Sequence, residues 1–139
     1  NEPSNHFIIN WMACSHRRHV TMIDKLQTLV GTLKYCASED TAYGEYEPEK
    51  YGELHNHCGC VAYVIQQMFG GSIRTGKVHG VKHYWNDLNG VEIDCSASQF
   101  GSTDIVFFPC ENGKDAPTRK TINPRFQKYW DRVQETLYR

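Results

Sequence analysis

Apolar residues in the middle of the chain recur at the spacing of an α-helix. Between Cys58 and Phe69 they fall three and four residues apart, so that one face of a helix is apolar along its length. Gly70 and Gly71 follow directly and favour the left-handed backbone that commonly ends a helix. The pattern therefore predicts a core-facing helix with Cys58 at or just before its first turn.

Two further apolar stripes predict helices before and after this one. Residues 21–35 carry the first stripe, and Thr21 with Asp24 forms an approximate capping box at its start. Residues 124–137 carry the second, where Asn123 is the expected N-cap and a proline occupies the first helical position. We therefore expect one helix on the N-terminal side of the central helix and one at the C-terminus.

Between the central and the last predicted helix, the hydrophobic period changes from 3.6 to 2, which is typical of strands. Asn89 and Gly90 favour the type I′ turn of a two-residue hairpin. Helices followed by an antiparallel sheet and a closing helix predict an α+β fold, in a single domain over residues 1–139. The expected strands are 72–78, 81–88, 91–97 and 105–109.

The predicted hairpin gathers four side chains on one face of the sheet. With a two-residue turn Leu88 pairs with Val91, and alternate residues of each strand share a face. Diagonal neighbours on such a face lie close enough for a histidine–aspartate hydrogen bond. A three-residue loop with a bulge would instead move Asp94 to the opposite face. The four residues are His83, Trp85, Asp94 and Ser96.

Cys58 is the candidate nucleophile. At the start of a helix, unpaired N–H groups and the positive end of the helix dipole stabilise a thiolate. His83 is then the candidate general base, and Asp94 would orient its ring by accepting a hydrogen bond from it. The sequence thus predicts a Cys–His–Asp arrangement for acyl transfer through a thioester.

The segment before Cys58 is long and polar. Residues 38–56 contain three tyrosines together with glycine and proline, and a loop of this length in a small domain is usually functional or mobile. Its position predicts that it walls the cleft, and its tyrosines either line a substrate groove or fix the loop to the domain. Residues 1–18 show no clear period and are interpreted as an N-terminal extension.

Several short runs match the pattern of a known family: Cys58, Gln66, Phe69-Gly70-Gly71-Ser72-Ile73, His83-Tyr84-Trp85-Asn86, Glu92-Ile93-Asp94 and Ser98-Gln99-Phe100. They resemble the YunG-like family of small bacterial and phage-associated proteins, which in turn resemble papain-like cysteine hydrolases. The resemblance implies a papain-like core, in which the nucleophile-bearing helix packs on an antiparallel sheet of about four strands. It also implies that Cys58 is the nucleophile, His83 the general base and Asp94 the orienting acid.

The chain departs from the family pattern at the oxyanion hole. A Gly-Gln pair precedes the cysteine in the family, whereas this chain has Asn56 and His57. In papain-like enzymes the glutamine helps to bind the oxyanion, and losing such a donor costs about 10²–10³-fold in rate in a well-measured hydrolase. Asn56 and His57 are therefore candidate oxyanion residues, together with the Cys58 N–H. Trp85 is a candidate for shaping the pocket, with core packing as the alternative.

Two other functions fit the sequence. Four zinc-type ligands lie within six residues, so a zinc-binding domain is one alternative. The other is a papain-like module that binds a partner without catalysis, for which surfaces rich in tyrosine and tryptophan are suited. The four zinc-type ligands are His55, His57, Cys58 and Cys60, and a second pair would come from His79, His83, Cys95 and Cys110.

Composition narrows the classes of partner. The net charge is −1 without a run of five like charges, which argues against nucleic-acid binding, and no apolar run approaches the ~20 residues of a membrane span. Six cysteines without the spacing of a disulfide framework favour reduced thiols and a cytoplasmic location. Because the chain begins at Asn1 and not at Met, secretion or delivery as an effector is the alternative. We expect no cofactor or metal, and a peptide, isopeptide, glutamine side chain or small amide as substrate.

Overall fold

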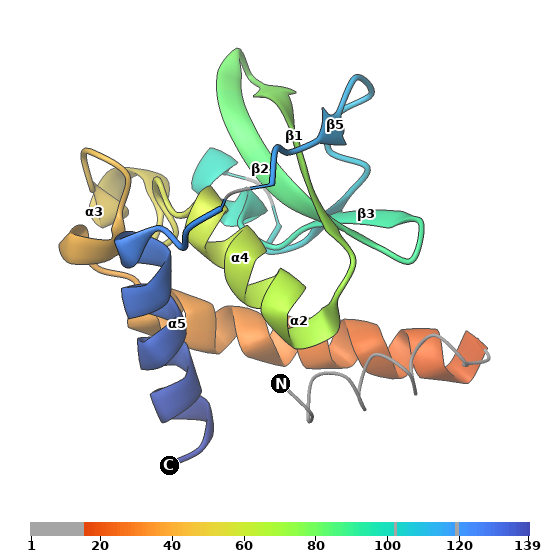
Figure 1. Cartoon of the computed structure of the whole chain (residues 1–139), viewed down its shortest axis with the longest axis horizontal. Helices are drawn as coiled ribbons and strands as arrows, with labels where there is room; N and C mark the ends of the chain where they lie inside the picture. Colours follow the sequence, from red (N-terminus) through yellow and green to blue (C-terminus); the bar gives the residue numbers. More distant parts are fainter. Residues whose placement is uncertain (1–15, 102, 119) are drawn as a thin grey trace.

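The computed structural model describes residues 16–101, 103–118 and 120–139, and its central element is helix α4 (Cys58–Phe69). Helix α4 packs on the sheet and on helix α5 (Pro124–Leu137), which in turn packs on helix α2 (His16–Cys36) (Figure 1). The predicted end of α4 is confirmed, because the helix stops before Gly70, which has a φ of 81°. Its predicted apolar face is buried through Cys60, Val61, Ala62, Val64, Ile65 and Phe69.

One apolar core joins the three helices to the sheet, since each element buries one face against the others. Tyr129 of α5 is fully buried in it and donates its hydroxyl hydrogen to the carbonyl of Leu33 in α2 at 2.5 Å. The α+β class predicted from the sequence is therefore confirmed. Other core residues are Met22, Leu26, Val64, Ile65, Leu88, Ile93 and Val133.

Helix α2 begins earlier than the sequence predicted. It starts at His16, so Thr21 lies within the helix and is not its N-cap. The predicted capping box was therefore wrong: each added helical residue gains a backbone hydrogen bond, so a helix can extend beyond its apolar stripe. The expected N-terminal extension, residues 1–18, lies outside the described residues except for 16–18, which belong to α2.

The sheet has five antiparallel strands in the order β4-β3-β2-β1-β5, where about four were expected. The additional strand, β5, lies in a polar stretch that the sequence pattern leaves as loop. It pairs with β1, and the guanidinium of Arg74 lies 2.9 Å from the carboxylate of Asp115 across this edge. The strands are β1 (Ser72–Val78), β2 (Val81–Leu88), β3 (Val91–Asp94), β4 (Val106–Phe107) and β5 (Lys114–Asp115).

The register predicted for the β2–β3 hairpin is confirmed, because Leu88 pairs with Val91. Asn89 and Gly90 have φ angles of 56° and 88°, as a type I′ turn requires. Strand β3 ends at Asp94, short of the predicted residue 97. The Asp94 carboxylate accepts a hydrogen bond from the Ser96 N–H at 2.9 Å, and this local turn leads into the 3-10 helix η2 (Ala97–Phe100).

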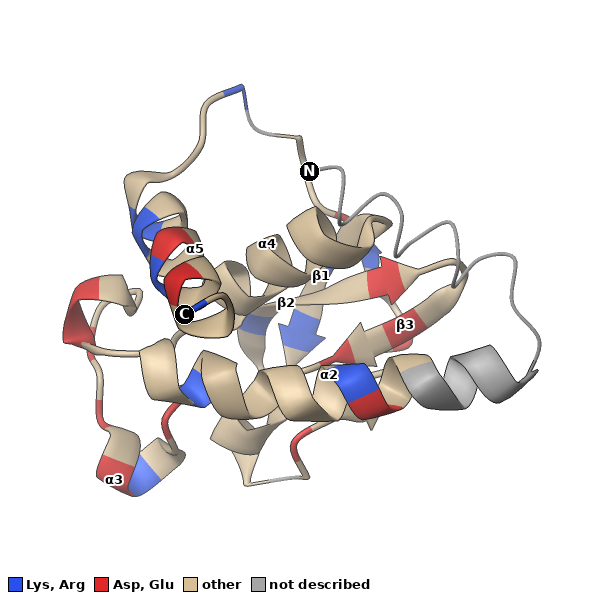
Figure 2. Cartoon of the chain, turned by 90° about the horizontal axis from the view of Figure 1, so that it is seen from below, with Lys and Arg blue, Asp and Glu red and all other residues tan. Residues whose placement is uncertain are grey.

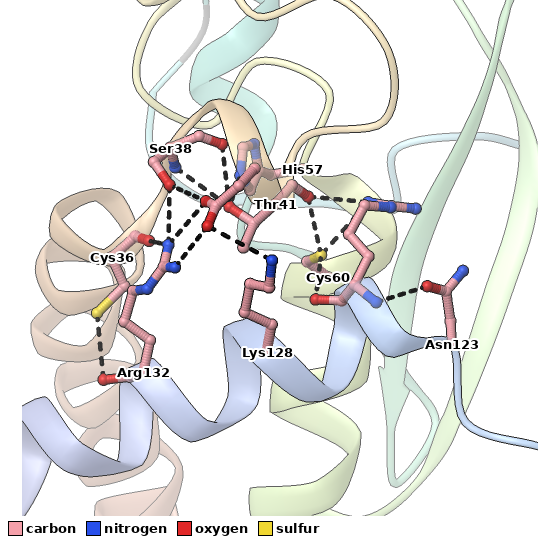
Figure 3. Close-up of polar contacts among 10 residues, drawn as sticks. Cys36, Ser38, Thr41, His57, Cys60, Asn123, Lys128 and Arg132 are labelled. Carbon is pink, nitrogen blue, oxygen red and sulfur yellow. Dashed lines mark hydrogen bonds and ion pairs between the residues drawn. The ribbon is translucent and has the colours of Figure 1, made fainter.

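Segment 38–56 contains the 3-10 helix η1 (Glu39–Thr41) and the short helix α3 (Pro48–Tyr51). Its first part is tied to α5, where Arg132 contacts both carboxylate oxygens of Asp40 at 2.9 and 3.2 Å (Figure 3). Hydrogen bonds from Arg132 and Ser38 hold the pKa of Asp40 well below its usual range. The loop thus starts from a fixed point on the helical side of the fold.

Charged residues of both signs lie on three of the helices, whereas α4 carries none. Lys and Arg positions are interspersed with Asp and Glu positions along α2, α3 and α5 (Figure 2). In the part of the chain that the structure describes, no helix is both long and apolar enough to cross a bilayer.

Replacing Asn123 by alanine tests the predicted start of α5. The Asn123 side-chain oxygen accepts a hydrogen bond from the Arg125 N–H at 2.8 Å, which satisfies one first-turn donor. Asn123→Ala is expected to lower the free energy of unfolding by about 1 kcal/mol, measured by urea denaturation. Asn123→Asp keeps the acceptor and should retain most of this stability. An alanine variant as stable as the parent protein would show that the cap contributes nothing.

Candidate functional site

Cys58 is the first residue of α4 and is partly exposed. The N-cap residue, His57, makes no side-chain capping bond, and the first N–H groups of an α-helix have no partner within the helix. The thiol therefore lies beside unpaired donors and the positive end of the helix dipole. This is the position that the sequence predicted for it.

His83 of β2 contacts both of the other predicted site residues. Its Nε2 lies 2.7 Å from the Asp94 carboxylate, and both side chains are buried, with exposed fractions of 1% and 2%. Because the carboxylate accepts, Nε2 carries the proton, which leaves Nδ1 as the ring nitrogen free to interact with Cys58. The structure thus brings Cys58, His83 and Asp94 together, from a helix and two neighbouring strands.

The pKa of His83 follows from these contacts. Burial disfavours the charged imidazolium and lowers the pKa. The hydrogen bonds to Asp94 and Cys58 act in the opposite direction and outweigh burial, so that the pKa rises to about 9. At neutral pH the ring is accordingly held as a cation between the carboxylate and the thiol.

Asp94 is itself held by residues for which the sequence predicted no role. Its second oxygen accepts hydrogen bonds from the Ser96 N–H and hydroxyl, both at 2.9 Å. The Gln99 amide nitrogen donates to the Ser96 carbonyl at 3.1 Å. Two signals were available: Ser96 falls on the same predicted sheet face as His83, and Gln99 belongs to a run that matches the family pattern.

A cavity of about 750 Å³ opens beside the Cys58–His83 contact. Segment 38–56 contributes to its wall through Tyr51 and Asn56, as predicted from the position of that segment, and η2 contributes Phe100. The tyrosines of the segment divide between the two roles left open. Tyr51 lines the cavity, whereas Tyr46 fixes the loop by donating its hydroxyl hydrogen to the Glu53 carbonyl at 2.8 Å.

Of the three proposed substrate-contacting residues, only Asn56 lines this cavity, and its side-chain nitrogen already donates to the Glu45 carbonyl at 2.6 Å. Trp85 is 1% exposed and donates its indole N–H to Glu92 at 2.8 Å, so it packs in the interior. Its ring lies 6.0 Å from that of His83, which makes it a wall behind the base.

His57 is turned into the protein interior and is fully buried (Figure 3). Its Nδ1–H donates to the His55 carbonyl at 2.8 Å, and its Nε2 accepts from the Thr41 hydroxyl at 2.7 Å. Burial lowers its pKa, so the neutral ring is favoured. Because both ring nitrogens are hydrogen-bonded within the protein, the His57 side chain stabilises the loop and is not available to bind an oxyanion.

The four residues proposed as zinc ligands do not converge. His55 accepts the Glu47 N–H, His57 bonds within the loop, Cys58 contacts His83, and Cys60 lies inside the fold. The Cys60 sulfur receives an Arg125 N–H at 3.4 Å, and burial raises its pKa to about 12 (Figure 3). In residues 16–101, 103–118 and 120–139, no group of three or more His, Cys, Asp or Glu is arranged to hold a metal ion.

Comparison with known proteins gives two matches. A family model described as YunG protein matches residues 25–138, which is most of the chain. A protein of Bacillus subtilis (strain 168) named uncharacterized protein YunG is 44% identical over 43 residues, or 31% of this chain and 37% of that protein. The alignment therefore spans little more than a third of the Bacillus protein. No solved structure matches the chain.

Proposed function

The chain belongs to the YunG protein family, and we propose that it is a cysteine-dependent acyl-transfer enzyme with a papain-like core, acting on an amide or isopeptide bond. The supporting observation is that one buried imidazole, His83, lies 2.7 Å from a buried carboxylate and lines the same cavity as the thiol at the start of α4, which helps to raise the pKa of His83. A nucleophile, a base and an orienting group within hydrogen-bond reach are the arrangement that nucleophilic catalysis needs. A cysteine on a helix with its histidine on the adjoining sheet also suits a papain-like core.

The proposed reaction follows from these contacts. His83 holds the proton given up by the Cys58 thiol, as an imidazolium, and the Cys58 sulfur attacks the substrate carbonyl carbon to form a C–S bond. When the C–N bond breaks, His83 donates its proton to the leaving amine, and the acyl group stays on sulfur as a thioester. Water or a second amine then attacks the thioester carbon and loses a proton to His83, and the C–S bond breaks. The acyl product leaves, and the charged His83 lies again beside the freed Cys58 sulfur.

When the sulfur attacks, negative charge develops on the substrate carbonyl oxygen, and hydrogen-bond donors must stabilise it. Because the Asn56 and His57 side chains donate elsewhere, we assign this role to the backbone N–H groups at the start of α4. These donors cannot be satisfied within the helix and lie at the positive end of its dipole. Such preorganised donors stabilise an oxyanion without reorganisation during the reaction.

The surface beside the thiol supports an extended substrate. A second cavity of about 690 Å³ is lined by Gly59, Tyr63, Tyr84 and Phe126, and it shares Lys82 with the cavity that contains Cys58. An amide bond between two chain segments places substituents on both sides of the attacked carbonyl. We therefore propose a peptide or isopeptide in preference to a small amide.

Selective alkylation tests the nucleophile. At pH 7, iodoacetamide is expected to modify Cys58 at least about 10-fold faster than Cys60 and Cys95, because Cys58 is partly exposed and the other two thiols are buried. Burial raises the pKa of both other thiols, that of Cys60 to about 12. Peptide mass mapping over a time course measures each rate.

The variant Cys58→Ala distinguishes a nucleophile from a structural thiol. It should lose all acyl transfer while its free energy of unfolding changes by less than about 0.5 kcal/mol, since the thiol is partly exposed. Equal, slow modification of Cys58 and the buried thiols would favour the non-catalytic binding module instead.

A further inference from the structure

Gln99 connects two parts of the site that are far apart in the sequence. Its side-chain oxygen accepts the Asn56 N–H at 3.2 Å, two residues before Cys58. Its side-chain nitrogen donates to the Ser96 carbonyl at 3.1 Å and lies 3.3 Å from the Ser96 hydroxyl. Both ends of one amide are therefore used, one on the nucleophile's segment and one on the segment that follows Asp94.

These contacts belong to a network of hydrogen bonds that reaches the base. From Ser96 the network passes to the Asp94 carboxylate at 2.9 Å and from there to His83 at 2.7 Å. His83 lines the same cavity as Cys58, which is two residues after Asn56 in the chain. Because Asp94, Ser96 and His83 are all at least 98% buried, water competes little for these bonds.

The backbone conformation of Asn56 explains why a side-chain hydrogen bond is needed to hold this residue in place. Its φ of 57° is uncommon for a residue with a side chain, although asparagine tolerates it better than most. Gln99 holds the N–H of this residue, and Glu45 holds its side chain at 2.6 Å. This turn sets the direction in which the chain enters α4. It therefore also sets the orientation of the first N–H groups of the helix.

We propose that Gln99 is a positioning residue, which sets the backbone donors at the start of α4 relative to the His83–Asp94 pair. The inference rests on the proposed acyl-transfer function and adds to it the residue that aligns the oxyanion donors with the nucleophile and base. Gln99 reaches the reacting atoms through Asn56 and Ser96.

Two reactions of Cys58 separate this role from general stability. Acylation by p-nitrophenyl acetate passes through an oxyanion, whereas alkylation by iodoacetamide requires the thiolate but no oxyanion donor. In Gln99→Leu, the acylation rate is expected to fall about 10-fold or more, and the alkylation rate by less than about 3-fold. Gln99→Glu keeps an acceptor for the Asn56 N–H but loses the donor to the Ser96 carbonyl, so it should recover only part of the acylation rate.

Gln127 provides the matched control, since its amide donates to Asp131 on the surface of α5 at 2.8 Å. Gln127→Leu should leave both rates unchanged. Parallel losses of acylation, alkylation and Tm in Gln99→Leu, without recovery in Gln99→Glu, would overturn the positioning role, and so would unchanged acylation in both variants. If Cys58 of the parent protein reacts with neither reagent, the proposed function itself fails and the role of Gln99 fails with it.

Discussion

His83→Asn is expected to lower the rate of Cys58 acylation by an activated ester about 10²–10⁴-fold, the range attributed to one general acid–base group. Asparagine can still donate a hydrogen bond to the Asp94 carboxylate, which lies 2.7 Å from the imidazole in the parent protein. It cannot accept the thiol proton at neutral pH. Release of p-nitrophenolate under single-turnover conditions measures the rate directly.

His79→Asn is the control for this substitution, because His79 lines the same cavity as Cys58, whereas the Asp94 carboxylate contacts His83. His79 is an exposed residue of the β1–β2 turn, and its φ of 51° is a conformation that asparagine tolerates. Its replacement should change the acylation rate by less than about 3-fold. A His83 variant that acylates as fast as the control would show that the imidazole takes no part in the reaction.

The free energy of unfolding is expected to fall as pH rises from about 6.5 to about 9. The pKa of His83 is about 9 in the folded protein, above the value of 6.5 for an unperturbed histidine. Its contribution is therefore complete below pH 6.5 and is lost as pH rises through 9. A difference of this size corresponds to a contribution on the order of 3 kcal/mol. Urea denaturation at half-unit pH steps measures it.

His57 produces the opposite dependence on the acidic side. Burial lowers its pKa in the folded protein, so folding favours the neutral ring, and stability is lost as pH falls below about 6.5. These two histidines together predict a stability maximum near pH 6.5. In Asp94→Asn the alkaline slope should shrink, because the carboxylate that holds the imidazolium is gone. A flat profile between pH 6.5 and 9 in the parent protein would contradict the charged His83–Asp94 pair.

Local sequence patterns were sufficient for the parts of the site that belong to single elements. The apolar period and the glycines after it placed Cys58 at the start of α4, and the Asn-Gly turn set the register of the β2–β3 hairpin. That register brought His83 within reach of Asp94, at 2.7 Å in the structure. Such features depend on residues close in the chain, whose geometry is set by backbone sterics and side-chain periodicity.

The same reasoning was less successful where the local signal was weak. Strand β5 has only two residues, both polar, and exists through its pairing with β1. Helix α2 starts at His16, before any apolar stripe marks it. Pairing with β1 therefore decided where β5 lies, and the gain of backbone hydrogen bonds extended α2 beyond its apolar stripe.

By itself, then, the sequence determined the α+β class, the start of α4 and the pairing of the hairpin that carries the base. Only the tertiary structure decided which side chains face the thiol and which support it. In the folded protein His57 is buried and Trp85 packs in the interior. Gln99 forms a hydrogen bond with Asn56, which is 43 residues away in the sequence. The physical reason is that a hydrogen bond between distant segments forms only after the core has packed and excluded water, and no repeat along the chain records that contact.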